Sequence, residues 1–133
     1  MDDVNFNMLI LIVDDSLSMR RIVKKFIENS GFHNVMEAGD GIEALDIVQK
    51  QKTIDLIISD LNMPNMNGLE FLKIVKEDSR TKDIPFIMLT VEAIQRTMNK
   101  AIALGVDSYI VKPIAEKVFI NEMLRVIRFK NEV

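Results

Sequence analysis

The sequence predicts a doubly wound α/β fold, in which a five-stranded parallel sheet carries five helices on its two faces. Short apolar runs rich in β-branched residues, which are typical of parallel strands buried on both faces, recur along the chain. Each run is followed by a segment of helical length whose apolar residues lie three and four positions apart. Because strand and helix alternate strictly, we expect right-handed βαβ units with helices on both faces of one sheet.

The predicted strands and helices follow one another in a regular order. The strands comprise residues 8–13, 35–38, 54–59, 84–89 and 108–111. The apolar stripes of the helices extend over residues 19–27, 42–48, 69–75, 94–102 and 119–127. Gly31 follows the first helix and Gly105 the fourth, at positions where a left-handed residue commonly closes a helix. Pro85 stands at the beginning of a strand, where its missing N–H is tolerated.

The length of the chain, 133 residues, fits one domain. A domain of this size buries roughly two-thirds of the surface of its unfolded chain, which is enough for a core without disulfides. We therefore expect one domain over residues 1–133 with its core at about 8–129. The tail after Arg128 is too short for a second domain, so no effector domain is expected.

Composition excludes several classes of function. The sequence contains no cysteine, which excludes disulfides, thiolate metal sites and a catalytic thiol. The net charge of −3 disfavours binding to DNA. No apolar run approaches the ~18 residues that a membrane-spanning helix needs. The N-terminus lacks the basic start of a secretory signal, so we expect a cytoplasmic protein without membrane insertion.

Polar residues follow four of the predicted strands, at the point where each strand ends. Asp14 and Asp15 follow the first strand, Asp60 the third, Thr90 the fourth and Lys112 the fifth. In sheets of this kind, ligands bind beyond the carboxyl ends of the strands, where the strand order reverses. The flavodoxin-like strand order 2-1-3-4-5 makes the first and third strands neighbours. We therefore expect these five side chains to gather on one rim of the sheet.

This set of side chains favours phosphoryl chemistry assisted by a metal ion. Two carboxylates about 4 Å apart repel by roughly 4 kcal/mol at an effective dielectric constant near 20, so the acids need a compensating cation. Oxygen ligands of this kind suit Mg²⁺. Lys112 can pair with Asp60 in the empty site or hold a phosphoryl oxygen in the filled one. An aspartate in this setting can attack phosphorus, while Thr90 donates a hydrogen bond.

Each of these residues also has an ordinary structural interpretation when it is taken alone. Asp15 or Ser16 could cap the first helix, and Thr90 could cap the fourth. Lys112 before Pro113 could belong to an unremarkable loop. The occurrence of all of them at the strand ends of one sheet favours the functional interpretation.

The lone histidine, His33, follows Gly31 and Phe32 in a predicted loop far from the strand ends, and we interpret it as a surface residue. A phosphoryl donor must therefore come from another protein.

The chain resembles the receiver domain of two-component response regulators, particularly its single-domain, CheY-like chemotaxis form. The resemblance extends from about residue 8 to 129. Its most specific part is the stretch DLNMPNMNG at 60–68, and it is reinforced by VDDS at 13–16, LT at 89–90 and YIVKP at 109–113.

The resemblance implies a role for each residue of the rim. Asp60 is implied as the phosphoacceptor, which receives its phosphoryl group from the phosphohistidine of a histidine kinase. Asp15, Asp60 and the backbone carbonyl of Asn62 are implied as direct Mg²⁺ ligands, with Asp14 acting through metal-bound water. Lys112 is implied to contact the phosphoryl group.

The resemblance also implies a switch and an output surface. Thr90 would shift toward the phosphoryl group, and Tyr109 would change between outward and inward rotamers. This change would reach a protein target on the face formed by the fourth helix, the fifth strand and the fifth helix. A cis bond between Lys112 and Pro113 is implied as well. The family thus implies a stand-alone phosphoacceptor protein, used in chemotaxis or motility and open to a phosphatase, rather than an enzyme acting on other substrates.

One position departs from the family pattern. The residue after Thr90 is commonly Ala or Gly, whereas here it is Val91, whose branched side chain is expected to narrow access to the phosphoryl group. Glu92 and Asn62 flank the same site and are candidates to orient or exclude the hydrolytic water. The lifetime of the phosphorylated state is therefore the property most open to change in this chain.

Other phosphate and metal proteins fit the sequence less well. A haloacid-dehalogenase-type phosphatase needs a second acid two residues after the first, where this chain has Asn62, and also needs a longer chain. A flavin-binding protein would place a phosphate loop where Asp14 and Asp15 stand. An EF-hand is excluded because Pro64 and Asn65 occupy positions that require a ligand and a glycine. A receiver fold that serves as an adaptor or dimerisation module without phosphorylation remains the alternative.

Two surface features have simpler interpretations. Arg20–Arg21 and Lys24–Lys25 form a basic group on the first helix, which we interpret as a solvated face. The last helix has a broad apolar arc, and Val118 and Phe129 fall outside the stripe that a core needs. A partner surface on that helix is a hypothesis.

Overall fold

The strands form a single parallel sheet in the order β2-β1-β3-β4-β5 in the computed structural model, which describes residues 4–51 and 53–131. Within these residues the strands are β1 Leu9–Val13, β2 Asn34–Ala38, β3 Leu56–Ser59, β4 Phe86–Thr90 and β5 Ser108–Val111. The helices are α1 Leu17–Asn29, α2 Gly41–Lys50, α3 Gly68–Glu77, α4 Gln95–Ala103 and α5 Glu116–Asn131. The predicted fold class, strand order and alternation are confirmed.

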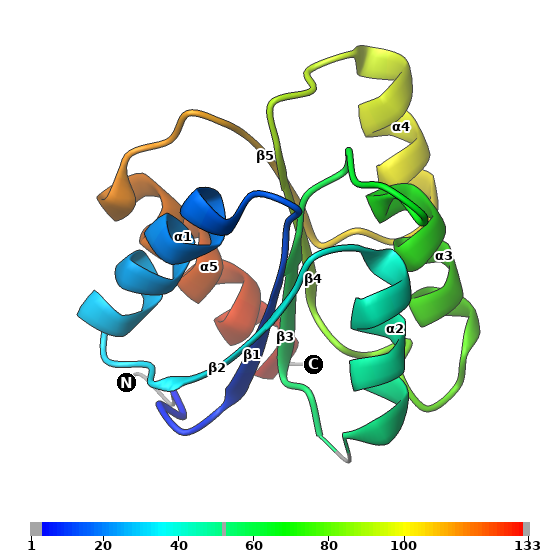
Figure 1. Ribbon diagram of the computed structural model, residues 1–133. Helices are drawn as coiled ribbons and strands as arrows, with labels where there is room; N and C mark the ends of the chain where they lie inside the picture. The colour runs from blue at the N-terminus through cyan, green and yellow to red at the C-terminus, as the bar shows by residue number, and fades with distance from the viewer. Residues whose placement is uncertain (1–3, 52, 132–133) are drawn as a thin grey trace.

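The helices cover both faces of the sheet, with α1 and α5 on one side and α2, α3 and α4 on the other (Figure 1). Successive side chains of a strand point to opposite faces. Accordingly, Ile10 and Ile12 of β1 pack in the core under α1 and α5, whereas Leu11 and Val13 pack in the core under α2 and α3. Burial on both faces explains why β1, β3 and β4 appear in the sequence as nearly continuous apolar runs, whereas the edge strand β2 is mostly half-buried.

The strand boundaries differ from the prediction mainly at the strand beginnings. β3 begins at Leu56 rather than at residue 54, because Asp55 caps the neighbouring strand: its Oδ2 accepts from the N–H of Leu9 at 2.8 Å. β4 begins at Phe86, whose N–H donates to Asp107 Oδ2 at 2.8 Å, and extends to Thr90. Thr90 is therefore the last residue of its strand.

The helix starts identify which polar residues are caps. Ser16 caps α1 by accepting from the N–H of Met19, so of the two candidates the serine is the cap. Ile94 stands at the cap position of α4 and makes no side-chain cap bond. The interpretation of Thr90 as a helix cap is therefore wrong, because α4 begins five residues after it.

The interpretation of the basic group on α1 as a solvated face is wrong for half of its members. Arg21 and Lys25 are exposed. Arg20 and Lys24 lie on the side of α1 that faces β2, where Glu37 pairs with Arg20 at 2.9 Å and with Lys24 at 3.8 Å. A one-residue step along a helix turns a side chain by about 100°, which separates the two classes.

The structure also tests the expectations for His33 and for the glycines that close two helices. His33 is exposed in the irregular segment before β2, as predicted. Gly31 and Gly105, which follow α1 and α4, have φ angles of 101° and 98°, the left-handed conformation expected of a closing glycine. In the part of the chain that the structure describes, no helix combines the length and the apolarity needed to cross a membrane.

Candidate functional site

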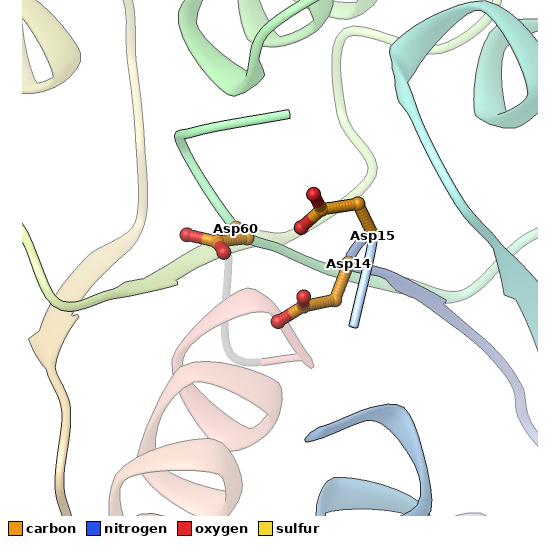
Figure 2. Close-up of side chains that lie close together, drawn as sticks. All are labelled: Asp14, Asp15 and Asp60. Atoms are coloured by element: carbon orange, nitrogen blue, oxygen red, sulfur yellow. The ribbon is translucent and has the colours of Figure 1, made fainter. Parts of the chain in front are cut away.

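Three carboxylates meet at the carboxyl end of the sheet because β1 and β3 are hydrogen-bonded neighbours. Val13, the last residue of β1, is in register with Ser59, the last residue of β3, and the acids follow directly. One oxygen each from Asp14, Asp15 and Asp60 lies within 4.8 Å of the others. Figure 2 shows the three side chains turned toward a common space. An all-oxygen donor set of this kind fits a hard divalent cation.

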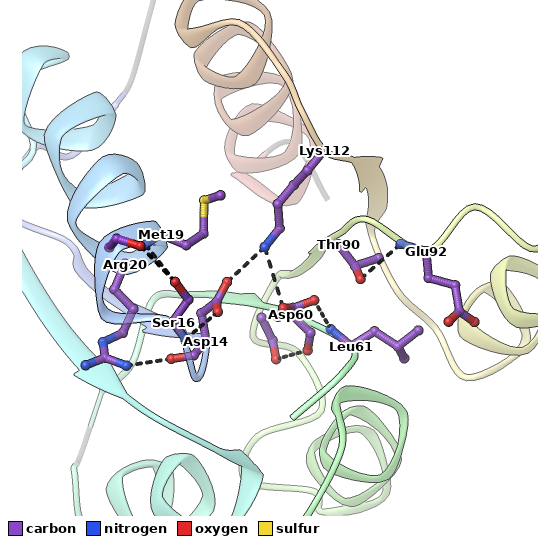
Figure 3. A network of polar contacts seen from close by, with 11 residues as sticks. Asp14, Ser16, Met19, Arg20, Asp60, Leu61, Thr90, Glu92 and Lys112 are labelled. Atoms are coloured by element: carbon purple, nitrogen blue, oxygen red, sulfur yellow. Dashed lines mark hydrogen bonds and ion pairs between the residues drawn. The ribbon is translucent and has the colours of Figure 1, made fainter. Parts of the chain in front are cut away.

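Backbone and side-chain hydrogen bonds hold the Asp60 carboxylate in place. The N–H of Asp60 donates to the carbonyl of Val13 at 2.8 Å, and the buried Ser59 hydroxyl donates to the Asp60 carbonyl at 2.8 Å. The N–H of Leu61 donates to Asp60 Oδ1 at 2.6 Å. Asp60 Oδ2 faces the ammonium group of Lys112 (Figure 3). Asp60 therefore presents one anchored oxygen and one oxygen beside a cation.

The ammonium group of Lys112 lies between two carboxylates. Its Nζ is 2.9 Å from Asp14 Oδ2 and 3.5 Å from Asp60 Oδ2, so the predicted pairing with Asp60 is present but is the longer of the two contacts. The backbone of Lys112 is tied to the end of β4, since its N–H donates to the Thr90 carbonyl at 2.8 Å. The Lys112–Pro113 peptide bond is cis. One ammonium against three carboxylates leaves an excess of negative charge in the cluster.

The residues after β4 connect the site to α4 and β5. Thr90 is fully buried, and its Oγ1 accepts from the N–H of Glu92 at 3.3 Å. The hydroxyl of Tyr109 donates to the carbonyl of Glu92 at 2.8 Å. Burial, followed by the nearby charges of Glu92 and Asp60, raises the pKa of Tyr109. Glu92 thus joins Thr90 to Tyr109 through its own backbone.

Glu92 and Val91, two of the residues predicted to modulate the site, have different surroundings in the structure. The Glu92 carboxylate accepts from the hydroxyl of Thr97 on α4 at 2.7 Å and points away from Asp60 (Figure 3). The side chain of Val91 is 67% exposed beside the buried Thr90. The Glu92 carboxylate is thus engaged with α4, and the side chain of Val91 is largely exposed to solvent.

The loop between β3 and α3, which carries Asn62, is fastened to the start of α2. The amide of Asn65 donates to Asp40 Oδ2 at 2.7 Å, and the N–H of Gly41 donates to the Met66 carbonyl at 3.1 Å. The pKa of Asp40 is lowered by its hydrogen bonds from the Glu43 N–H and from Asn65. Asn62 is exposed in this loop, two residues after Asp60.

A groove crosses β5 and α5 next to Tyr109. Val111, Ile114, Val118 and Arg125 are among its lining residues. Phe129 lines a neighbouring hollow that also includes Arg125. The side-chain hydrogen bond from Arg125 lowers the pKa of Glu122 to about 2, despite the opposing effect of burial. The two apolar residues outside the helix stripe, Val118 and Phe129, are both exposed on this face.

The sequence of the chain matches the response regulator receiver domain over residues 10–124. The chain belongs to the response regulator receiver family. Among curated receiver proteins, it is 42% identical over 125 residues to chemotaxis protein CheY1 of Helicobacter pylori, a match that spans 94% of this chain and 100% of that protein. It is 44% identical over 110 residues to chemotaxis protein CheY-3 of Vibrio cholerae, with 83% and 84% of the two chains covered.

The receiver fold is equally clear among solved structures. The crystallised chemotaxis response regulator CheY4 of Vibrio cholerae superposes with a TM-score of 0.82 at 38% identity, covering 90% of this chain and 98% of that one. The acid cluster of this receiver domain could bind a metal ion.

One residue of this receiver site escaped the sequence analysis. The guanidinium of Arg20 donates to the backbone carbonyl of Asp14 at 2.6 Å. The position of Arg20 in the sequence could have indicated this contact. Arg20 lies one helical turn after the cap residue Ser16 and three residues before the buried Val23, so its side chain is on the part of α1 near the end of β1. Because Arg20 belongs to a group of four basic residues, the sequence alone indicates that it is part of a solvated face.

Proposed function

We propose that the chain is a stand-alone response regulator that accepts a phosphoryl group on Asp60 from the phosphohistidine of a histidine kinase. The observation that carries the proposal is the Asp60 carboxylate at the end of β3, with one oxygen anchored by Leu61 and the other facing Lys112 beside two further acids. In the transfer, an Asp60 oxygen forms a bond to phosphorus while the bond from phosphorus to the histidine nitrogen breaks. The imidazole leaves with the electron pair of that bond.

Several residues are proposed to prepare the site for this transfer. Asp15, Asp60 and the Asn62 carbonyl would hold Mg²⁺ directly and Asp14 through water, and the ion would neutralise the phosphoryl oxygens when bound. Lys112, whose Nζ is 3.5 Å from Asp60 Oδ2 and 2.9 Å from Asp14 Oδ2, would contact a phosphoryl oxygen on Asp60. The three-carboxylate donor set supports this assignment.

We further propose that the signal leaves through the face formed by α4, β5 and α5. Thr90 and Tyr109 both bind the backbone of Glu92, so a shift of Thr90 toward a phosphoryl group would release the N–H of Glu92. Val118 and Phe129 are both exposed on α5, and Val118 lines the groove that Tyr109 also lines. These apolar side chains would contact the protein target.

The proposed cellular setting is drawn from the names of the relatives. Chemotaxis or motility is the proposed pathway, since several relatives carry chemotaxis names. Residues 1–133 would act as one receiver domain in the cytoplasm, without DNA binding or membrane insertion. The protein would catalyse only its own phosphotransfer and autodephosphorylation, and a phosphatase would be a further partner.

Intact-mass analysis tests the proposal. After incubation with a small acyl phosphate and Mg²⁺, the wild-type protein is expected to gain one phosphate. Chelation of Mg²⁺ before the donor is added is expected to remove most of this gain, because the clustered carboxylates then repel the incoming phosphate. A wild-type protein that gains no phosphate with Mg²⁺ present would instead support a phosphorylation-independent adaptor or dimerisation module.

Val91→Ala is expected to shorten the lifetime of the phosphorylated state. We expect the loss of two methyl groups next to Thr90 to ease the access of water to the phosphoryl group, while the high exposure of Val91 limits any loss of stability. The measurement is the rate of phosphate loss from purified phosphorylated protein after the donor has been removed. Ile102→Ala, at an exposed position near the end of α4, is a control for loss of an exposed apolar side chain. An unchanged rate in Val91→Ala would remove Val91 as a determinant of the lifetime.

A further inference from the structure

We propose that Arg20 is a positioning residue for the cation site: it holds the peptide unit between Asp14 and Asp15, so that both acids face the ion. The proposal rests on the proposed function, since it concerns the Mg²⁺ site of that function. Arg20 touches no carboxylate of the cluster. It acts through the backbone of Asp14.

The contacts of Arg20 show how it can do this. Its Nη1 donates to the Asp14 carbonyl at 2.6 Å, and its Nε donates to Glu37 Oε1 at 2.9 Å (Figure 3 shows the first contact). The side chain of Arg20 is 18% exposed and that of Glu37 is 30% exposed, so the pair is largely shielded from solvent. A rigid guanidinium that is anchored at one nitrogen can direct another nitrogen at a fixed point.

Arg20 completes the fixation of Asp14. The N–H of Asp14 donates to the carbonyl of Ala38, the last residue of β2, at 3.0 Å. Arg20 links the carbonyl of Asp14 to Glu37, the preceding residue of the same strand. The N–H of Asp14 is therefore bonded directly to β2, and its carbonyl is connected to β2 through Arg20. Because a peptide unit is planar, fixing the Asp14 carbonyl also fixes the N–H of Asp15 and the direction in which Asp15 continues.

The side chain of Asp14 is held from other directions. Its Oδ1 accepts from the N–H of Ser16 at 2.9 Å, and its Oδ2 pairs with Lys112 at 2.9 Å. The neighbouring Arg21 is exposed and lies about 100° around α1 from Arg20, so it does not share this role. The chain thus offers a control with the same charge one residue away.

Charge and positioning predict opposite effects of removing Arg20. A positive charge beside a cation site opposes binding of the ion, so the loss of this charge alone would strengthen Mg²⁺ binding. The loss of positioning would weaken it, because the acids would no longer converge in the apo protein. The sign of the change therefore separates the two effects.

The experiment compares Arg20→Gln and Arg21→Gln with the wild type in Mg²⁺ titrations followed by thermal unfolding. The melting temperature without Mg²⁺ reports folding stability, and its dependence on Mg²⁺ concentration yields the dissociation constant. We expect Mg²⁺ to bind Arg20→Gln about tenfold more weakly, the low end for residues that orient metal ligands. Arg21→Gln is expected to stay within about twofold of the wild type, because solvent and salt screen an exposed charge.

Arg20→Lys adds a test of geometry. It keeps the charge but lacks the fork that reaches both Glu37 and the Asp14 carbonyl, so we expect weakened binding in this variant too. Equal or tighter Mg²⁺ binding in Arg20→Gln, with a wild-type protein that binds the ion, would overturn the role of Arg20 alone. A wild-type melting temperature that does not respond to Mg²⁺ would overturn the cation site itself, and with it both proposals.

Discussion

Asp60→Asn is expected to lose phosphate uptake completely under conditions in which the wild-type protein gains one phosphate. The carboxamide lacks the anionic oxygen that attacks phosphorus, and no neighbouring acid occupies the same point at the end of β3. Asn can keep the anchoring contact, because its carbonyl oxygen accepts from the N–H of Leu61 as Asp60 Oδ1 does at 2.6 Å. The fold should therefore persist. Intact-mass analysis after treatment with a small acyl phosphate and Mg²⁺ measures the difference.

The matched control for this substitution is Asp46→Asn. Asp46 is an exposed acid of α2 that pairs with Lys50 at 3.1 Å, away from the strand ends. The Asp46→Asn variant should gain one phosphate, as the wild-type protein does. An equal adduct in Asp60→Asn would place the phosphate elsewhere and remove Asp60 as the acceptor.

Gly68→Ala is expected to destabilise the protein by about 1–3 kcal/mol and to impair phosphate uptake. A Cβ atom at this position would lie 2.3 Å from the carbonyl oxygen of Asp60 and 2.9 Å from the Cα of Leu61. Both neighbours are backbone atoms, so the first turn of α3 must move away from the end of β3. This movement also strains the 2.8 Å hydrogen bond from the Gly68 N–H to the Leu61 carbonyl. The movement would also displace Asp60, the proposed phosphoacceptor.

Urea unfolding measures this loss, and Gly39→Ala is the control. A Cβ atom at Gly39 would meet its nearest neighbours, the side-chain ends of Glu43 and Arg20, only at 3.8 Å and 3.9 Å. These are ordinary contacts, so Gly39→Ala should be close to neutral. If both variants unfold at the same urea concentration, the close approach of α3 to Asp60 is not a constraint on this protein.

The fold was predictable because its signals are local. Burial of β1, β3 and β4 on both faces leaves apolar runs, and the run at β5 matches its observed range, Ser108–Val111. The strand beginnings were less predictable. Ile84 and Pro85 have the composition of a strand, but the ladder starts at Phe86, where Asp107 supplies the capping acceptor from a distant part of the chain.

The residues of the site were also predictable, because each stands at the end of an apolar run. Once the strand order is known, Asp14 and Asp60 must be neighbours, and the register of Val13 with Ser59 agrees with that expectation. The sequence alone could not tell which of several similar residues has a role at the site. Four basic residues on α1 look alike in the sequence, yet only the side of the helix that faces β2 brings Arg20 to Glu37 and to the Asp14 carbonyl.

The sequence by itself determined the sheet, the helices that cover it and the acids, hydroxyl and ammonium of its rim, because burial periodicity and strand ends are properties of neighbouring residues. Only the tertiary structure decided how these groups are paired. Lys112 lies closer to Asp14, 98 positions away, than to Asp60, and Arg20 serves the backbone of an acid rather than the solvent. Such pairings depend on distances of a few ångströms between elements that pack against one another, and no local pattern in a sequence records them.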